Sequence, residues 1–171
     1  PLSWEELQSL HPFCQMSLEH RDSYNYMIEE LSERLKDITG FDCINYQSNS
    51  GAMGELSGLA VIKSYHKDVS EGVRNTILIP ESAHGTNFSS ARLAGFKIKR
   101  FSDSLTIEKF KEVCDGLGDS LAGLMITYPT TYGLFNSDIK EICEIIHNSG
   151  GLVYMDGANM NAQCGLTSPR E

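Results

Sequence analysis

The sequence predicts an α/β protein with a mostly parallel sheet and helices on both of its faces. Two observations lead to this class. Short apolar runs alternate with longer segments of helical periodicity, and most of the runs are apolar throughout, as strands covered on both faces are. The chain has 171 residues, 40% hydrophobic and 22% charged, which fits one globular domain or part of a larger one.

Residues 1–40 are predicted to be an N-terminal helical segment. Apolar residues between Tyr24 and Ile38 recur mostly at steps of three or four, which marks one face of a helix. Gly40 is placed to end that helix. Residues 41–171 are then the α/β domain.

The α/β domain is predicted to hold strands at five apolar runs and helices between them. The predicted strands are Cys43–Tyr46, Thr76–Ile79, Phe96–Phe101, Leu121–Thr127 and Gly151–Met155. The predicted helices are Gly51–His66, Gly85–Ala94, Leu105–Leu117 and Asp138–Asn148. The strand–helix–strand order favours right-handed crossovers on a parallel sheet.

Composition excludes several classes of partner. With 14 basic and 23 acidic side chains the formal net charge is −9, which argues against nucleic acid or an anionic membrane as the main partner. No apolar run approaches the roughly 20 residues of a membrane span, and no basic-then-apolar leader is seen. The five cysteines form no C-x-x-C pair, which favours free thiols over a disulfide or zinc framework.

Ligands of open α/β sheets bind beyond the carboxyl ends of the strands. Small, polar and Gly-rich segments follow four of the predicted strands, namely residues 49–54, 82–87, 128–133 and 156–159. The functional site is therefore expected there.

The segment Asn49–Gly54 joins a predicted strand to a predicted helix. Free backbone N–H groups at a helix start attract an anion, and Gly51 lets the chain approach a ligand closely. The alternative is a plain tight turn, since neither a Walker A nor a G-x-G-x-x-G pattern is present.

His84 follows a predicted strand and is flanked by small residues. An imidazole there has room to stack on a flat heteroaromatic ligand, and a structural histidine is the alternative. We assign no role beyond surface or capping to the other histidines, which are His11, His20, His66 and His147.

Asp156 ends the last predicted strand. A carboxylate at the end of a buried strand needs a cationic or hydrogen-bonding partner. A protonated pyridine nitrogen fits this need, a Mg²⁺ ion is a competing partner, and capping of the following turn is the structural alternative. The hydroxyls of Thr127, Thr130 and Thr131 are placed to meet a phenolate or phosphate, or belong to a simple turn.

Taken together, these features describe one ligand. A phosphate at one end, a flat ring stacked by His84 and a ring nitrogen paired with Asp156 describe pyridoxal 5′-phosphate (PLP). No metal site is predicted.

Several stretches resemble the glycine decarboxylases of the glycine cleavage system, the P-protein family. The resemblance covers essentially the whole chain, and the Asp-Gly-Ala-Asn-Met-Asn-Ala run is its most specific part. The stretches are Trp4, His11–Phe13, Ser50–Glu55, Ser82–Asn87, Met125–Pro129 and Tyr154–Gln163. The resemblance implies the large domain of the aspartate aminotransferase-like PLP fold, fold type I.

The resemblance also implies roles for individual residues. His84 matches the residue that stacks on the ring and Asp156 the partner of the pyridine nitrogen, and these two are the implied catalytic residues. Ala158 matches the residue on the opposite ring face, and Thr131 a threonine near the cofactor. The family's turn that binds the cofactor phosphate corresponds to Ser50, Gly51, Ala52 and Met53.

The chain departs from the family pattern in three respects. Met53 stands where a Gln is expected, which removes a side-chain contact, and Phe88 stands where a Pro is usual. The family's Schiff-base lysine lies in a Leu-His-Lys-Thr segment that this chain does not contain, and the small C-terminal domain is absent too. We therefore expect an internal fragment that is inactive alone.

The implied reaction is PLP-dependent decarboxylation of glycine, with transfer of the aminomethyl group to the lipoyl arm of the H-protein. Further implied partners are other segments or subunits of the P-protein, in a dimer, located in bacterial cytoplasm or the mitochondrial matrix. Another fold type I decarboxylase, or a non-catalytic interaction module of P-protein type, is the alternative.

Overall fold

The computed structural model describes residues 18–70 and 73–170, so the matches at Trp4 and His11–Phe13 lie outside the described residues. The chain divides into two compact units. One consists of Pro1–Ile44 with Thr167–Glu171, and the other of Asn45–Leu166.

The described part of the first unit is built around helix α2, Leu18–Thr39. Gly40 has a φ of +74°, and its amide donates to the carbonyl of Lys36 at 2.7 Å. A left-handed residue directly after a helix is a common helix end, and glycine adopts it without steric cost. The predicted helix and its end at Gly40 are confirmed.

The second unit contains a parallel sheet, as predicted, formed by four of the five predicted strands. Its strands are β1 (Thr76–Pro80), β2 (Lys97–Phe101), β3 (Leu121–Thr127) and β4 (Leu152–Asp156), in the spatial order β2-β1-β3-β4. Strand β3 is buried along its whole length, whereas β2 is an edge strand with three basic residues, Lys97, Lys99 and Arg100. Charged side chains on an edge strand discourage pairing with another chain.

The predicted strand at Cys43–Tyr46 is wrong. These residues form no strand and pair with none of the four strands. Cys43, Asn45 and Tyr46 are exposed, and the two compact units divide between Ile44 and Asn45. A short apolar run forms a strand only when a neighbouring strand takes up its backbone hydrogen bonds, and this run has no such neighbour among the described residues.

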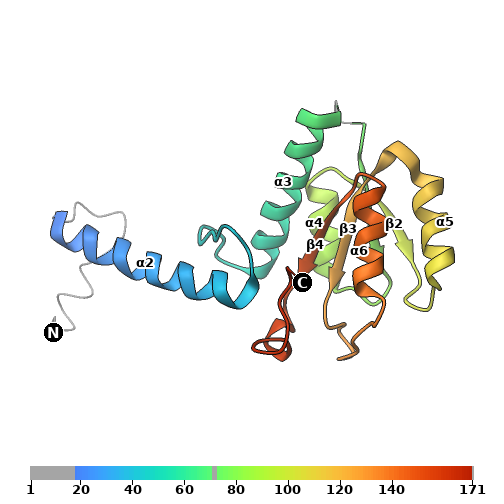
Figure 1. Ribbon diagram of the computed structural model, residues 1–171. Helices are drawn as coiled ribbons and strands as arrows, with labels where there is room; N and C mark the ends of the chain where they lie inside the picture. Colours follow the sequence, from blue (N-terminus) through green and yellow to red (C-terminus); the bar gives the residue numbers. More distant parts are fainter. Residues whose placement is uncertain (1–17, 71–72, 171) are drawn as a thin grey trace. The chain divides into compact units, whose positions relative to one another are not determined.

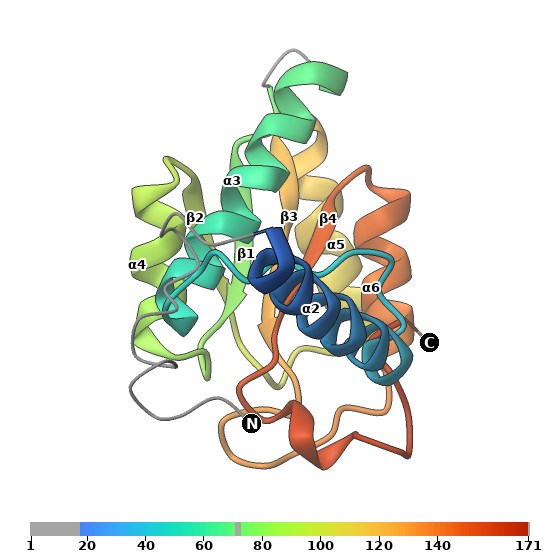
Figure 2. The ribbon, with the colours of Figure 1, turned by 90° about the vertical axis from the view of Figure 1, so that its left-hand side faces the viewer.

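Helices cover both faces of the sheet, which confirms the predicted fold class (Figure 1). Helices α3 (Gly51–Ser70) and α4 (Gly85–Leu93) pack on one face, the face toward the viewer in Figure 2. Helices α5 (Ile107–Leu117) and α6 (Ile139–Asn148) pack on the other. No helix in the described ranges is long and apolar enough to cross a membrane.

The alternation of side chains along the strands divides the core into two clusters. Ile77 and Ile79 of β1 point toward α3 and α4, and Leu78 points toward α5 and α6. His66 of α3 lies in this interior, 1% exposed, with Nε2 2.7 Å from the carbonyl oxygen of Ala122 in β3. The surface or capping role predicted for His66 is therefore wrong, because its ring bonds a strand carbonyl under the helix.

Candidate active site

A cavity of about 360 Å³ lies where the carboxyl ends of β3 and β4 meet the N-termini of α3 and α4. We call it the Asp156 cavity. Predicted site residues that line it are Gly51, Ala52, His84, Thr131, Asp156 and Ala158. The lining also includes Glu55, Thr86, Thr127 and Asn159, and the predicted residues Ser50 and Met53 are outside it.

Ser50 and Met53 lie next to the cavity and organise the start of α3. The hydroxyl of Ser50 accepts from the amide of Met53 at 3.3 Å, and the carbonyl of Ser50 accepts from Gly54 at 3.0 Å. These bonds leave the amides of Gly51 and Ala52 as first-turn N–H groups without a partner in the helix. This end of α3 therefore offers two donors and a partial positive charge to an anion.

His84 caps α4. Its Nδ1 accepts from the amide of Thr86 at 3.2 Å and lies 2.8 Å from the Thr86 hydroxyl. The imidazole is thereby held at one nitrogen while the exposed ring lines the cavity. His84 thus has a structural role as a helix cap. The same cap fixes the ring where a flat ligand would contact it.

Asp156 ends β4 as a half-buried carboxylate with three donors. Oδ1 accepts from the amide of Ala158 at 3.1 Å, which caps the following turn. Oδ2 accepts from the hydroxyl of Thr127 at 3.1 Å and from Asn87 Nδ2 at 3.2 Å. The turn cap that we weighed as an alternative for Asp156 is therefore real, but it uses only one of the two oxygens.

Glu55 is a second carboxylate at this site and was missed in the sequence analysis. It lies one turn into α3, is 6% exposed, and its Oε1 accepts from the Thr86 hydroxyl at 2.8 Å and from Asn87 Nδ2 at 2.9 Å. Its burial follows from the packing of α3 against α4, which periodicity does not reveal. The only sequence signal was its place inside Ser50–Glu55, one of the stretches that resemble the P-protein family.

The floor of the cavity is negatively charged and lacks a counter-ion from the chain. Within residues 18–70 and 73–170, no lysine, arginine or histidine forms an ion pair with Glu55 or Asp156. Burial, and to a lesser degree these two carboxylates, raises the pKa of Tyr154 to about 12. A ligand that brings a cationic group to Asp156 would compensate this charge.

Thr131 and its loop close another side of the cavity. The hydroxyl of Thr131 donates to the carbonyl of Ser82 at 2.9 Å, so this predicted cofactor residue bridges two of the loops beyond the sheet. Asn159 Nδ2 donates to the carbonyls of Pro129 and Thr130, at 3.1 Å each, and holds the same loop from the β4 side. Asn159 falls in the most specific run of the resemblance but had no predicted role.

The Mg²⁺ ion weighed as a partner for Asp156 finds no support in the geometry. No group of three or more metal-binding side chains occurs in the part of the chain that the structure describes.

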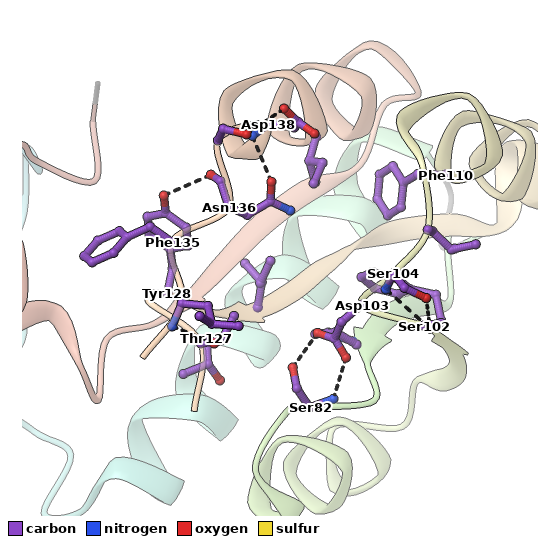
Figure 3. Close-up of a pocket in the computed structure, with 18 of the residues that line it drawn as sticks. Ser82, Ser102, Asp103, Ser104, Phe110, Thr127, Tyr128, Phe135, Asn136 and Asp138 are labelled. Carbon is purple, nitrogen blue, oxygen red and sulfur yellow. Dashed lines mark hydrogen bonds between the residues drawn. The ribbon is translucent and has the colours of Figure 1, made fainter. Parts of the chain in front are cut away.

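A second cavity, of about 380 Å³, lies on the α5 and α6 side of the same sheet edge (Figure 3). Its polar groups already bond one another. Asp103 accepts from the amide and hydroxyl of Ser82, and Asn136 accepts from the amide of Asp138 (Figure 3). Of the residues that line this cavity, only Thr127 also lines the Asp156 cavity.

Comparison with known sequences finds relatives named as glycine dehydrogenases. No family model matches. The glycine dehydrogenase (decarboxylating) of Shewanella halifaxensis is 50% identical over 99% of this chain. The corresponding protein of Shewanella frigidimarina is 49% identical over the same share. The chain spans 18% of the length of either relative.

Comparison of structures gives the same fold. An inhibitor-bound glycine decarboxylase (P-protein) of the glycine cleavage system superimposes with a TM-score of 0.69, at 13% identity, over 98% of this chain and 36% of that one. The sequence resemblance to the P-protein family and the predicted fold class are confirmed by these similarities. The residue roles carried over from that family stay predictions.

Proposed function

We propose that this chain is part of the cofactor-binding domain of a PLP-dependent glycine decarboxylase and that the Asp156 cavity holds PLP. One observation carries the proposal: residues assigned to the cofactor from the sequence, in four separate segments that follow predicted strands, line a single cavity. They are Gly51, Ala52, His84, Thr131, Asp156 and Ala158. The 50% identity to a glycine dehydrogenase supports the same assignment.

The donor set of the cavity fits the charges of PLP. The amides of Gly51 and Ala52 at the start of α3 suit a phosphate. Asp156, which has no cationic partner among the described residues, suits a protonated pyridine nitrogen. The cavity thus favours a ligand that is anionic at one end and cationic at the other.

Asp156 supplies the charge on which the chemistry depends. When bound, PLP provides an electron sink for the pair left on the α-carbon of glycine as its carboxylate departs as CO₂. Asp156 keeps a proton on the pyridine nitrogen, since a carboxylate beside the nitrogen favours its charged form. The cap to Ala158 and the bonds to Thr127 and Asn87 hold the carboxylate in one orientation.

His84 and Ala158 fix the plane of the ring. The imidazole stacks on one ring face while Thr86 holds its Nδ1, and the small side chain of Ala158 leaves room for the ring on the other. A fixed ring plane lets the bond to the departing carboxylate align with the π system. Thr131 and Asn159 hold the loop that closes the site.

The reaction of the whole protein is proposed from its relatives. After CO₂ leaves, the aminomethyl group passes to the lipoyl arm of the H-protein. This chain contains no Leu-His-Lys-Thr segment, so the family's Schiff-base lysine is not among its residues. The chain therefore contributes the phosphate, ring and nitrogen contacts and not the covalent attachment.

The test uses the complete product of the gene that encodes this chain, saturated with PLP and supplied with lipoylated H-protein. Label from bicarbonate should enter the carboxyl group of glycine, because decarboxylation is reversible at this stage. Glutamate serves as the parallel substrate. Bound PLP with turnover of glutamate alone would indicate another decarboxylase, and absence of PLP binding would indicate an interaction module. Either result overturns the proposal.

A further inference from the structure

Asn87 is a fully buried amide that joins the two carboxylates of the site. It is 0% exposed, and its Nδ2 lies 2.9 Å from Glu55 Oε1 and 3.2 Å from Asp156 Oδ2. Because ionised carboxylates only accept hydrogen bonds, both N–H groups of Asn87 must face them. The orientation of this amide is therefore fixed by its two neighbours.

Glu55 is a rigid acceptor for Asn87. Besides the bond from Thr86, its Oε2 accepts from the hydroxyl of Ser90 at 2.6 Å, so both carboxylate oxygens are engaged. The donors Thr86, Asn87 and Ser90 all come from α4, and Glu55 comes from α3. The packing of α3 on α4 thus sets the position of Asn87 at the end of β4.

Asp156 receives two donors on the same oxygen. Asn87 Nδ2 and the Thr127 hydroxyl both reach Oδ2, and Thr127 Oγ1 also lies 3.5 Å from Asn87 Oδ1. Because a donor prefers the plane of the oxygen that it reaches, these two bonds fix the orientation of the carboxylate.

We infer that Asn87 is a positioning residue: held by Glu55 and acting with Thr127, it orients the Asp156 carboxylate toward the pyridine nitrogen of the cofactor. This inference rests on the proposed function. Without the donors on Oδ2 the carboxylate can turn away from the pyridine nitrogen. The nitrogen then loses its proton at lower pH, and the ring becomes a poorer electron sink.

Glu55 contributes through its hydrogen bonds and not through its charge. Glu55→Gln removes the charge and keeps the bonds, since its amide oxygen still accepts from Thr86 and Asn87. The hydroxyl of Ser90 can reverse and accept from the new amide nitrogen.

The experiment follows the ring-nitrogen chemical shift of isotopically labelled PLP by NMR across a pH series, in the complete gene product. In the wild type the ring nitrogen should stay protonated through neutral pH. In Asn87→Ala the midpoint of the shift change should fall by about one to two pH units, the scale of one lost hydrogen bond to a charged group. Glu55→Gln should keep the wild-type midpoint, whereas Glu55→Ala should lower it.

Thr127→Val, which removes the other donor on Oδ2 and keeps the side-chain shape, answers the same question if Asn87→Ala does not fold. The matched control is Ser89→Ala, an exposed residue of α4 whose hydroxyl bonds only the carbonyl of Gly85. A wild-type midpoint in Asn87→Ala, or in Thr127→Val as its substitute, overturns the inference. If the midpoint of Asp156→Asn nevertheless differs from that of the wild type, the proposed function still stands. A wild type that does not bind PLP overturns both.

Discussion

Thr127 and Asp156 are register partners at the last paired position of β3 and β4, and the hydroxyl of Thr127 lies 3.1 Å from Asp156 Oδ2. The backbone hydrogen bonds of the parallel ladder therefore fix the separation of the two side chains. A carboxylate placed by sheet register is held more precisely than one on a free loop, and such precision is what a site for charge stabilisation needs.

Gly51→Ala should weaken the phosphate contact without weakening the fold. A Cβ at Gly51 meets no atom of the described chain within 4 Å, and Gly51 lines the Asp156 cavity. We expect PLP affinity to fall about tenfold, or about 1.4 kcal/mol, and the free energy of unfolding to stay equal or rise by up to about 1 kcal/mol. Calorimetric titration with PLP and with pyridoxal separates the phosphate contribution from that of the ring.

Gly54→Ala is the matched control for that change. Gly54 lies in the same first turn of α3 with equally open space around its Cβ position, but it does not line the cavity. It should leave the PLP affinity unchanged. Equal loss of PLP affinity in both variants, or unchanged affinity in Gly51→Ala, would show that the start of α3 does not hold the phosphate.

Gly58→Ala should destabilise the second unit. A Cβ at Gly58 would overlap the ring of Tyr154, because α3 crosses β4 closely at this point. Overpacking of this kind costs about 1–3 kcal/mol. Urea unfolding monitored by circular dichroism measures the loss, with Gly54→Ala as the comparison. An unchanged midpoint for Gly58→Ala would mean that α3 does not pack this closely on β4.

Stability should decline at alkaline pH because a buried thiol and a half-buried phenol ionise more readily once the chain unfolds. Burial raises the pKa of Cys114 from 9.0 to about 11 and that of Tyr154 from 10.0 to about 12. The folded state therefore holds more protons than the unfolded state between pH 9 and 12, and the free energy of unfolding falls as pH rises through this window.

Tyr154→Phe isolates one part of this decline. The variant should lose less stability than the wild type between pH 10 and 12, the window set by Tyr154. Tyr132→Phe, at a tyrosine that is 76% exposed, is the control and should follow the wild type. Urea unfolding midpoints across the pH series give the comparison, and parallel curves for Tyr154→Phe and the wild type would contradict the prediction.

Much of the fold follows from the sequence because buried strands and helix ends leave local signals. An unbroken apolar run predicts the buried strand β3, and Gly40 marks the end of α2. The strand prediction at Cys43–Tyr46 was wrong because a strand needs a neighbouring strand to pair with, and a few residues of sequence do not show whether one is present. His66 misled for a related reason, since the carbonyl of Ala122 lies 56 positions further along the chain.

The candidate site was predictable where a single residue follows a strand and unpredictable where residues of two elements contact one another. Asp156 and His84 follow strands, so their place at the sheet edge could be inferred from the order of elements. Glu55 and Asn87 come from two helices, and their bond depends on how those helices pack. Periodicity gives the faces of helices but not the pairs formed between them.

The most direct test of the account is Asp156→Asn in the complete gene product, measured as glycine–bicarbonate exchange at saturating PLP together with PLP affinity. The side chain keeps its shape but loses its charge, so the ring nitrogen no longer holds its proton near neutral pH. The account predicts that exchange falls about 10²–10³-fold, or about 3–4 kcal/mol, while affinity changes far less. An exchange rate near that of the wild type with a lowered Tm would contradict it, because Asp156 would then be only the cap of the turn at Ala158.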